Sequence, residues 1–302
     1  MTNKSSIIEV LGNERLAEDV FCLKFLAPHV AAAARAGQFV MLMAYEKSER
    51  IPLTIAEADP ASGLVMVVFK VMGRSTSDLS LIKKGEALFY AAGPLGKPTE
   101  FPESGRAIAV GGGIGLALIF PVIKEMKNRG LDVTTIAGVR EKKFFFWEDK
   151  LRDGCEKFYL TSDDGSCGEK GFVTGPLKRE LDAFREGGRE GHPYASNGIK
   201  IVYAVGPVVM MRTVADLTRK YGVKTVVSLN PIMVDGTGMC GSCRVKVAGE
   251  VRFACVDGPD FDAHDVDFDE LLSRLTLYQD KEKEAAAESA PGSEAPHKCR
   301  CL

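Results

Sequence analysis

The hydrophobic pattern of the chain changes type near residue 98, and this change limits its possible folds more than any other feature. Before that point, short β-type runs such as GQFVMLMAY and GLVMVVFKVM are separated by glycine, proline or charged turns. After it, apolar strands alternate with helical stretches, as in RAIAVGGG followed by IGLALIFPVIKEMKNRG. The first pattern predicts an antiparallel β-barrel, and the second predicts an α/β domain with a doubly wound parallel sheet.

A chain of 302 residues with 45% hydrophobic content can bury more than one core, so two or three domains are expected. We place the barrel at residues 1–98 and the α/β domain at residues 99–227. The segment 228–268 is too short for an apolar core of its own and is expected to be organised by bound metal. The charged residues 269–302 are rich in Ala, Glu and Pro, which predicts a helical or disordered tail.

The charge balance argues against nucleic acid as a partner. Lys and Arg number 39 against 41 Asp and Glu, a net charge of -2, so small molecules and proteins are the expected partners. The N-terminus turns polar before an apolar run reaches the length of a signal peptide, and no stretch of about 18 uninterrupted apolar residues occurs. We expect a soluble, cytoplasmic protein without membrane insertion.

Cysteine spacing points to one metal site. The chain has eight cysteines, and in the reducing cytoplasm clustered cysteines indicate metal or redox chemistry instead of disulfides. Cys240, Cys243 and Cys255 lie within 16 residues, while three others are scattered. Cys299 and Cys301 lie in the tail, where we interpret them as a thiol pair and not as ligands.

The segment from Asp235 to Cys255 has the spacing of a plant-type 2Fe-2S loop with aspartate in the first ligand position. Four residues separate Asp235 from Cys240, two separate Cys240 from Cys243, and Cys255 follows after eleven more. We expect the last cysteine to arrive on a hairpin, RVKVAGEVRFAC, that turns at Ala248-Gly249. Three glycines suit a loop that wraps a compact cluster and presents backbone N–H groups to its sulfurs: Gly236, Gly238 and Gly241.

A structural zinc ion is the alternative occupant, because three thiolates and a carboxylate can also satisfy a tetrahedral metal. A zinc module would typically show two CxxC pairs, which this segment lacks. Asp235 is open to two interpretations, either as a ligand or as a residue that caps the loop. A carboxylate is a harder donor than a thiolate, so as a ligand it would give the cluster a potential different from that of an all-cysteine cluster.

Two segments in the first domain suit a flavin dinucleotide. An arginine and a helix N-terminus with small hydroxyl residues can neutralise a pyrophosphate, and a β-run can lay its backbone against the isoalloxazine edge. For the ring we predict Arg50, Pro52, Leu53 and Thr54; for the pyrophosphate region we predict Val71, Gly73, Ser75 and Thr76.

Two glycine-bearing strand ends in the second domain suit a nicotinamide nucleotide. The run VGGGIG follows a strand and begins a helix, although it departs from strict G-x-G-x-x-G. Pro121 should kink this helix or mark its first turn further along. Arg140, followed by Glu141, leaves the choice between NAD and NADP open. The predicted contacts are Gly111, Gly112, Gly113 and Gly115, with Gly206 and Pro207 after the later strand KIVYAV.

No catalytic triad, carboxylate pair or HExxH is found, so no catalytic side chain is predicted. Hydride transfer to a flavin needs little acid-base assistance, because the cofactors carry the chemistry.

Taken in order, RIPLT, VMGRST, VGGGIG, VGPVVMM and the cysteine loop are similar to motifs of the ferredoxin reductase-like electron-transfer subunits of the dihydroorotate dehydrogenase and sulfide dehydrogenase type. The resemblance covers residues 5–268 and implies a barrel that binds FAD, a domain that binds NAD(H), and a 2Fe-2S cluster beside the flavin that faces a partner subunit. Two departures stand out: Ser75, where the family often has glycine, and the tail.

Within this family, aspartate as the first ligand resembles the small subunit of NADH-dependent reduced ferredoxin:NADP oxidoreductase, whereas the dihydroorotate-linked subunits resemble four-cysteine proteins. That resemblance implies a larger partner flavoprotein related to the glutamate synthase small subunit, with FAD and 4Fe-4S clusters, and it implies ferredoxin as a further partner and electron bifurcation. The alternatives are a dihydroorotate dehydrogenase electron-transfer subunit and a zinc-stabilised, non-catalytic nucleotide-binding module.

Overall fold

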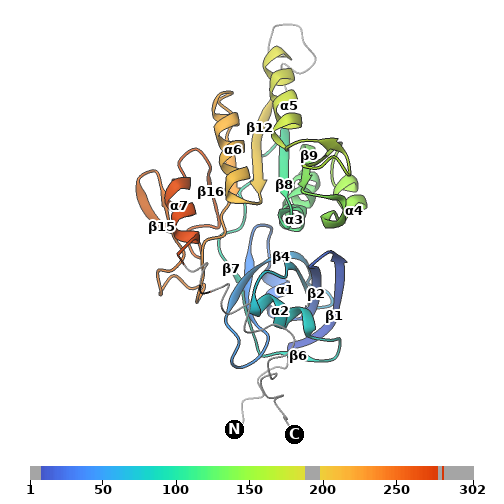
Figure 1. The fold of residues 1–302 in the computed structure, drawn as a ribbon, viewed down its shortest axis with the longest axis vertical. Coiled ribbons are helices and arrows are strands. Elements are labelled where there is room, and N and C mark those ends of the chain that lie inside the picture. Colours follow the sequence, from blue (N-terminus) through green and yellow to red (C-terminus); the bar gives the residue numbers. More distant parts are fainter. Residues whose placement is uncertain (1–7, 188–197, 278–280, 282–302) are drawn as a thin grey trace.

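The computed structural model describes residues 8–187, 198–277 and 281, and Figure 1 shows a barrel at one end and an α/β domain at the other. Cys299 and Cys301, and most of the predicted tail, lie outside the described residues. The segment after residue 228 packs along the side of the α/β domain.

Seven antiparallel strands form the barrel sheet, in the order β6-β1-β2-β5-β4-β3-β7. This confirms the antiparallel barrel predicted from the short apolar runs. Its elements in chain order are β1 (Ile8–Ala17), β2 (Val20–Leu26), α1 (Pro28–Ala33), β3 (Phe39–Met43), β4 (Ile51–Asp59), β5 (Leu64–Lys70), α2 (Arg74–Leu81), β6 (Ala87–Leu88) and β7 (Tyr90–Leu95).

Strand β2 is apolar on both faces because each face meets a different core. Successive side chains of a strand point to opposite sides. Leu23 and Phe25 belong to the core inside the barrel, whereas Val20 and Cys22 belong to a core shared with the α/β domain. Strand β5 alternates in the same way, which explains why the run GLVMVVFKVM is almost continuously apolar.

The α/β domain is built on one sheet in the order β11-β10-β9-β8-β12-β13-β16, parallel except for its last pair. The chain starts at β8 in the middle, moves outward through β9 and β10, and then returns to the other side of β8. This confirms the doubly wound sheet. Its elements are β8 (Arg106–Gly112), α3 (Gly115–Asn128), β9 (Asp132–Val139), a 3-10 turn (Lys142–Phe144), α4 (Glu148–Asp153), β10 (Lys157–Ser162), β11 (Glu169–Lys170), α5 (Thr174–Gly187), β12 (Ile199–Val205), α6 (Val208–Arg219) and β13 (Thr225–Ser228).

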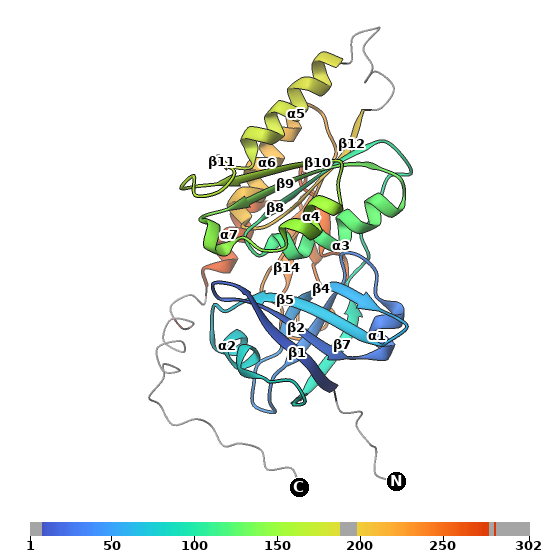
Figure 2. The same cartoon turned by 90° about the vertical axis from the view of Figure 1, so that its right-hand side faces the viewer.

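Helices cover both faces of this sheet, and Figure 2 shows α3 and α4 on the side of the barrel. Leu116 and Ile123 of α3 pack in the same core as barrel residues, while Leu177 of α5 and Val214 of α6 fill the core on the opposite face. Helix α3 begins at Gly115, so Pro121 lies in its interior and does not mark its first turn.

The cysteine segment contributes β14 (Arg244–Val247), β15 (Glu250–Phe253) and β16 (Asp260–Asp262). Helix α7 (Phe268–Leu275) begins at the last residue of this segment and continues into the predicted tail. Strands β14 and β15 form the predicted hairpin, with Val247 opposite Glu250. The turn residues Ala248 and Gly249 have φ values of 51° and 81°, the left-handed backbone that a tight two-residue hairpin turn requires. Strand β16 then pairs antiparallel with β13, so this segment extends the sheet of the α/β domain.

Candidate functional site

The predicted cluster ligands lie in a loop that is divided into a buried half and an exposed half. Cys243 and Cys255 are 1% and 2% exposed, and their sulfur atoms lie 3.2 Å apart. Burial and the neighbouring Cys243 thiol raise the pKa of Cys255 to about 12. Two thiols in contact in an apolar pocket fit a metal site, because a coordinated metal removes their protons and replaces the missing charge.

Cys240 and Asp235 form the exposed half of this site. The Asp235 carboxylate accepts hydrogen bonds from the backbone N–H of Thr237 over 2.7 Å and of Cys240 over 3.0 Å. These bonds, that of Thr237 first, lower the pKa of Asp235, and the Ser242 hydroxyl lowers the pKa of the Cys240 thiol. In this structure Asp235 therefore caps the loop, and its role as a metal ligand stays a prediction.

The division into two pairs suits a two-iron cluster, in which each iron takes two protein ligands in addition to the bridging sulfides. One pair is Cys243 and Cys255, and the other is Asp235 and Cys240. A single zinc ion would instead need its ligands to converge on one point about 2.0–2.3 Å away. Among the described residues, no three His, Cys, Asp or Glu side chains are grouped to hold a metal ion of either kind, so it is the pairing of the ligands that favours the cluster.

The cluster loop rests directly on the barrel. Gly236 has a φ of 77°, and a Cβ at this position would lie 2.8 Å from Met41 Cγ and 2.9 Å from Leu95 Cδ1. Met41 on β3 is also the ladder partner of Pro52 on β4. The structure thus brings the loop of Cys240 to the strand that neighbours the first predicted flavin segment.

The first flavin segment lies at the start of β4. Arg50 is exposed, with its guanidinium carbon 5.0 Å from the centre of the Tyr90 ring on β7. Pro52, Leu53 and Thr54 are half-buried and pair with β3. A planar cation beside an aromatic ring, next to exposed strand backbone, can receive a flat heterocycle and its phosphates.

The second flavin segment ends at the N-terminus of α2, as the sequence predicts. Gly73 is the N-cap residue, and Ser75 and Thr76 occupy the first turn. The Thr76 hydroxyl accepts from the N–H groups of Met72 and Gly73. Val71 packs on the barrel core that Leu53 also contacts, which places both flavin segments on one core.

The glycine turns of the α/β domain meet at the point where the strand order reverses. The run of glycines begins in the last two residues of β8 and continues past its end, and Gly206 with Pro207 follows β12, the strand adjacent to β8 on its other side. Nucleotides bind at such switch points, outside the carboxyl ends of the strands. The sequence prediction that both turns belong to one crevice is therefore supported by the sheet order.

Close backbone approach explains two of these glycines. A Cβ on Gly115 would lie 2.1 Å from the carbonyl oxygen of Val205, and one on Gly206 would lie 3.1 Å from Gly112 Cα. Gly113 has a φ of 56° and has open space around its Cα. Gly111 and Gly112 are fully buried between helices α3 and α6. Helix α3 can thus start directly against the end of β12.

One loop at the same sheet edge is absent from the sequence predictions. Residues 163–168 follow β10, and the Ser166 hydroxyl accepts from the backbone N–H of Lys142 in the turn after β9. Gly168 has a φ of 61°, and a Cβ there would lie 2.1 Å from the carbonyl oxygen of Leu160. The dipeptide Asp164-Gly165 directly after an apolar strand is the signal that could have located this loop.

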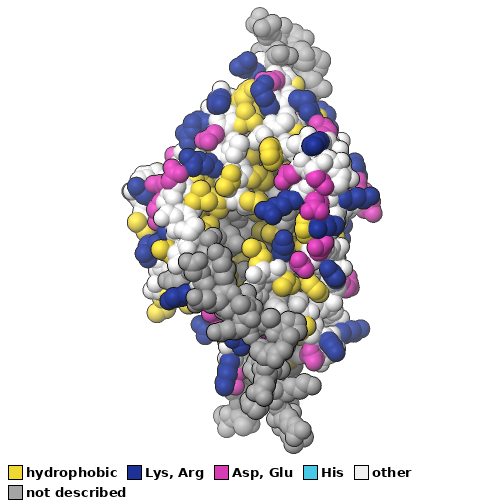
Figure 3. All heavy atoms as spheres, viewed as in Figure 1, with side chains coloured by type: hydrophobic (Ala, Val, Ile, Leu, Met, Phe, Trp, Pro, Cys, Tyr) yellow, Lys and Arg dark blue, Asp and Glu magenta, His cyan; other side chains and the backbone are white. Residues whose placement is uncertain are grey.

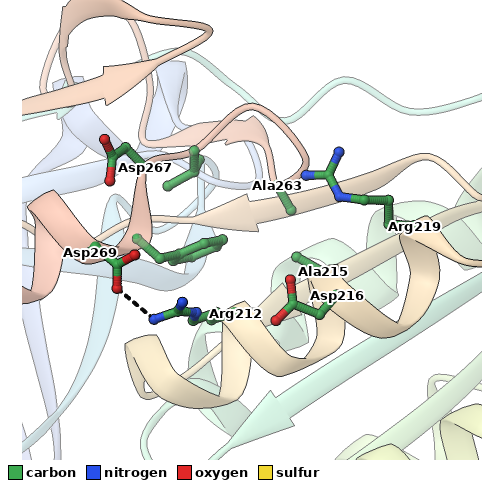
Figure 4. Close-up of a pocket in the computed structure, with 9 residues that line it drawn as sticks. Arg212, Ala215, Asp216, Arg219, Ala263, Asp267 and Asp269 are labelled. Carbon is green, nitrogen blue, oxygen red and sulfur yellow. Dashed lines mark hydrogen bonds and ion pairs between the residues drawn. The ribbon is translucent and has the colours of Figure 1, made fainter.

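A hollow of 190 Å³ lies between α6 and the start of α7, as Figure 4 shows. Arg212 donates to Asp269 over 2.7 Å, and Arg219 donates to the backbone carbonyl of His264. Both arginines belong to α6, and their partners are Asp269 of α7 and His264 of the cysteine segment. The contacts around this hollow therefore hold α7 and the cysteine segment against α6.

The surface has no single dominant charge. Figure 3 shows basic and acidic side chains interspersed on one face, with hydrophobic side chains exposed across its middle. Around the cluster loop, Met239, Val234 and Val256 are 89%, 54% and 40% exposed. No helix in the described ranges combines the length and apolar content needed to cross a membrane.

The cysteine segment and the whole chain both match known proteins. Residues 230–267 match the model of the iron-sulfur cluster binding domain of dihydroorotate dehydrogenase B. Over 92% of the chain and 94% of the relative, the sequence is 43% identical to a dihydroorotate dehydrogenase B (NAD(+)) electron transfer subunit homolog from Thermotoga maritima. An uncharacterized protein in the adh 3′ region of Clostridium beijerinckii is 39% identical over 97% of this chain and 98% of its own.

A solved structure agrees over almost the whole chain. It belongs to the NADH-dependent reduced ferredoxin-NADP oxidoreductase, which gave insights into flavin-based electron bifurcation, and it matches with a TM-score of 0.82 and 42% identity. The match covers 95% of this chain and 99% of the other. Phthalate dioxygenase reductase, at 16% identity and a TM-score of 0.53, shares the fold.

The sequence identity extends over the barrel, the nucleotide domain and the cysteine segment, and it is high enough to assign the chain to a family. The chain belongs to the family of dihydroorotate dehydrogenase B electron-transfer subunits and their homologues, oxidoreductase subunits with a ferredoxin reductase-like fold.

Proposed function

We propose that this chain is an electron-transfer flavoprotein subunit that exchanges a hydride between NAD(H) and FAD and passes single electrons through a 2Fe-2S cluster to or from a partner flavoprotein. The observation that carries the proposal is the contact of Gly236 with Met41, because Met41 pairs with Pro52 of the flavin segment. The cluster loop and the flavin segment thereby share one strand.

Each set of residues has a defined task in this proposal. Bound FAD accepts the hydride and, together with the cluster, converts a two-electron transfer into one-electron transfers. Arg50 and the N-terminus of α2, at Ser75 and Thr76, bind the flavin's charged groups, while Pro52 to Thr54 present backbone to its ring. The glycines after β8, with Gly206 and Pro207, seat the nicotinamide nucleotide in the switch-point crevice.

For the cluster, Cys243 and Cys255 would hold one iron, and Cys240 with Asp235 the other. The buried cysteines exclude water from their side of the site, and the exposed pair lies on the surface. Met239, Val234 and Val256 are exposed together around the cluster loop, and such a group of exposed apolar side chains suits a protein partner that covers this surface.

We further infer that the complete enzyme is a ferredoxin:NADP oxidoreductase, with electron bifurcation, whose partner is a larger flavoprotein with FAD and 4Fe-4S clusters, related to the glutamate synthase small subunit. Two observations support this choice over a dihydroorotate dehydrogenase. The solved ferredoxin-NADP oxidoreductase chain is 42% identical, close to the 43% of the Thermotoga maritima relative that is named a homolog of the dihydroorotate dehydrogenase subunit. The relatives named as dihydroorotate dehydrogenase subunits themselves, from Desulforamulus reducens and Geobacillus thermodenitrificans, are 30% and 29% identical. Aspartate also occupies the first ligand position.

The test is an anaerobic visible spectrum of the natively purified complex, with analysis of flavin, iron, acid-labile sulfide and zinc. NADH should bleach the flavin bands and then the cluster bands, and NADP reduction should require both NADH and reduced ferredoxin. A colourless protein that contains zinc would refute the proposal in favour of the non-catalytic module. Bleaching by dihydroorotate would instead identify a dihydroorotate dehydrogenase subunit.

A further inference from the structure

Asp260 lies where the three parts of the chain meet. One carboxylate oxygen accepts a hydrogen bond from the Thr99 hydroxyl over 2.6 Å, and the other accepts one from the Tyr203 hydroxyl over 2.8 Å. Thr99 belongs to the linker that leaves the barrel, Tyr203 belongs to β12 of the nucleotide domain, and Asp260 begins β16. The two donors are 7% and 1% exposed, so the carboxylate is turned inward.

The backbone around Asp260 follows the same three-way pattern. Lys97 donates to the carbonyl of Gly258 over 2.6 Å, which ties the segment to the linker. Leu229 donates to the carbonyl of Pro259 over 2.9 Å, which ties it to the end of β13. These contacts lie close in sequence to both proposed redox sites. Cys255 precedes Asp260 by five residues, and Leu95 of β7 precedes Thr99 by four.

We propose that Asp260 is a positioning residue, whose carboxylate holds the hairpin that carries Cys255 at a fixed place against the flavin barrel and so sets the rate of electron transfer between flavin and cluster. The inference rests on the proposed function. Asp260 itself exchanges no electron: each electron that leaves the reduced flavin arrives on the cluster, and the carboxylate affects only their separation and orientation.

Protonation of Asp260 should weaken this hold. Burial raises the pKa of Asp260 to about 6, although the Thr99, Tyr203 and Ser228 hydroxyls act in the opposite direction. The titratable group that faces it from β12 is Tyr203, whose own pKa burial raises well above its usual value, so Asp260 is the member of this pair that changes charge near pH 6. A protonated carboxyl loses the charge assistance of two hydrogen bonds, and one oxygen becomes a donor that faces another donor.

The experiment is stopped-flow mixing of the native complex with NADH, in which flavin reduction and the later bleaching of the cluster are followed separately. In the wild type, the flavin-to-cluster rate should fall about tenfold from about pH 7.5 to about pH 5, the population shift expected when both hydrogen bonds lose their charge assistance. The variant Asp260→Asn should show the slow rate at every pH, while hydride transfer to the flavin stays within about twofold of the wild type.

Two further variants separate positioning from general destabilisation. Tyr203→Phe keeps the carboxylate but removes one donor, so the midpoint of the pH profile should move to higher pH. Glu180→Gln is the matched control, because Glu180 is a buried carboxylate of the same domain, 3% exposed, that contacts neither the linker nor the cysteine segment. This control should keep the wild-type profile.

The positioning role would be refuted if Asp260→Asn kept the wild-type pH profile, or if Glu180→Gln lost it to the same extent. Absence of flavin or cluster bands in the wild-type complex would refute the proposed function instead. The two failures are therefore distinguishable in one set of samples.

Discussion

The contact between helix α3 and strand β12 gives the sharpest test of the nucleotide site. A methyl group at Gly115 would lie 2.1 Å from the carbonyl oxygen of Val205, whereas carbon and oxygen atoms in contact need about 3.3 Å. The variant Gly115→Ala must therefore move the start of α3 away from β12 by about 1.2 Å, the difference between these distances. The oxygen belongs to backbone in the middle of a parallel sheet, so it cannot turn aside as a flexible side chain could.

This displacement opens the crevice in which the nicotinamide nucleotide is proposed to bind. Misplacement of reacting groups by about 1 Å can cost about 100-fold in rate, and that is the loss expected in flavin reduction by NADH. The strain should also lower the free energy of unfolding by about 1–3 kcal/mol. Reduction of the cluster by dithionite should be unchanged, since it does not use the nucleotide site.

Gly175→Ala is the matched control for this variant. Gly175 also lies in the first turn of a helix of the nucleotide domain, but a Cβ there would meet no atom within 4 Å. Stopped-flow measurements of flavin bleaching should therefore give the wild-type rate for Gly175→Ala and the slow rate for Gly115→Ala. Equal rates for the two variants would show that the approach of α3 to β12 does not shape the nucleotide site.

Four other outcomes follow from the same structure. Glu180→Ala removes the buried carboxylate that Arg106 binds, while the ion pair of Arg106 with the more exposed Asp132 is retained, so chemical denaturation should show a loss of about 3 kcal/mol. Although burial acts to raise the pKa of Glu180, hydrogen bonds led by that of Lys157 lower it. The wild type should therefore lose stability as pH falls below the unfolded-state pKa of Glu180, and Glu180→Gln should lose less over the same pH range. Cys243→Ser should abolish the cluster bands while Cys22→Ser, at a buried cysteine of the barrel, retains them. Asp235→Ala should shift the cluster spectrum, and an unchanged spectrum would remove Asp235 from the ligand set.

Local pattern was enough to predict the elements that carry the site. The short apolar runs of β2 and β5, bounded by glycine, proline or charged turns, predicted the barrel, and the strand-turn-helix order around Gly113 predicted the parallel sheet. The hairpin turn at Ala248-Gly249 was also predicted, because the two flanking runs have strand periodicity and glycine tolerates positive φ. In each case the residues that give the sequence pattern lie within about 20 residues of the element that they predict. No contact between distant segments had to be known.

Contacts between distant segments could not be predicted in this way. The pairing of β16 with β13 depends on where the cysteine segment folds back, and three-residue strands have no periodic signal. The loop at residues 163–168 was missed because its importance comes from the sheet edge that it shares with the glycine turns after β8 and β12. In the sequence, nothing distinguishes Asp260 from the many other carboxylates of the chain. Its role depends on contacts with Thr99 and Tyr203, which only the folded structure shows.

Gly236 shows how one residue can satisfy a local and a distant requirement at once. The sequence indicates a glycine because the loop must turn sharply, and its φ of 77° agrees with that need. The absence of a side chain is needed for a second reason, because Met41 and Leu95 occupy the space where a Cβ would lie. An asparagine could adopt the turn but would push the loop off the barrel. The cluster loop therefore needs glycine here for its contact with the flavin domain, a requirement set by Met41 and Leu95, which lie 195 and 141 positions earlier in the chain.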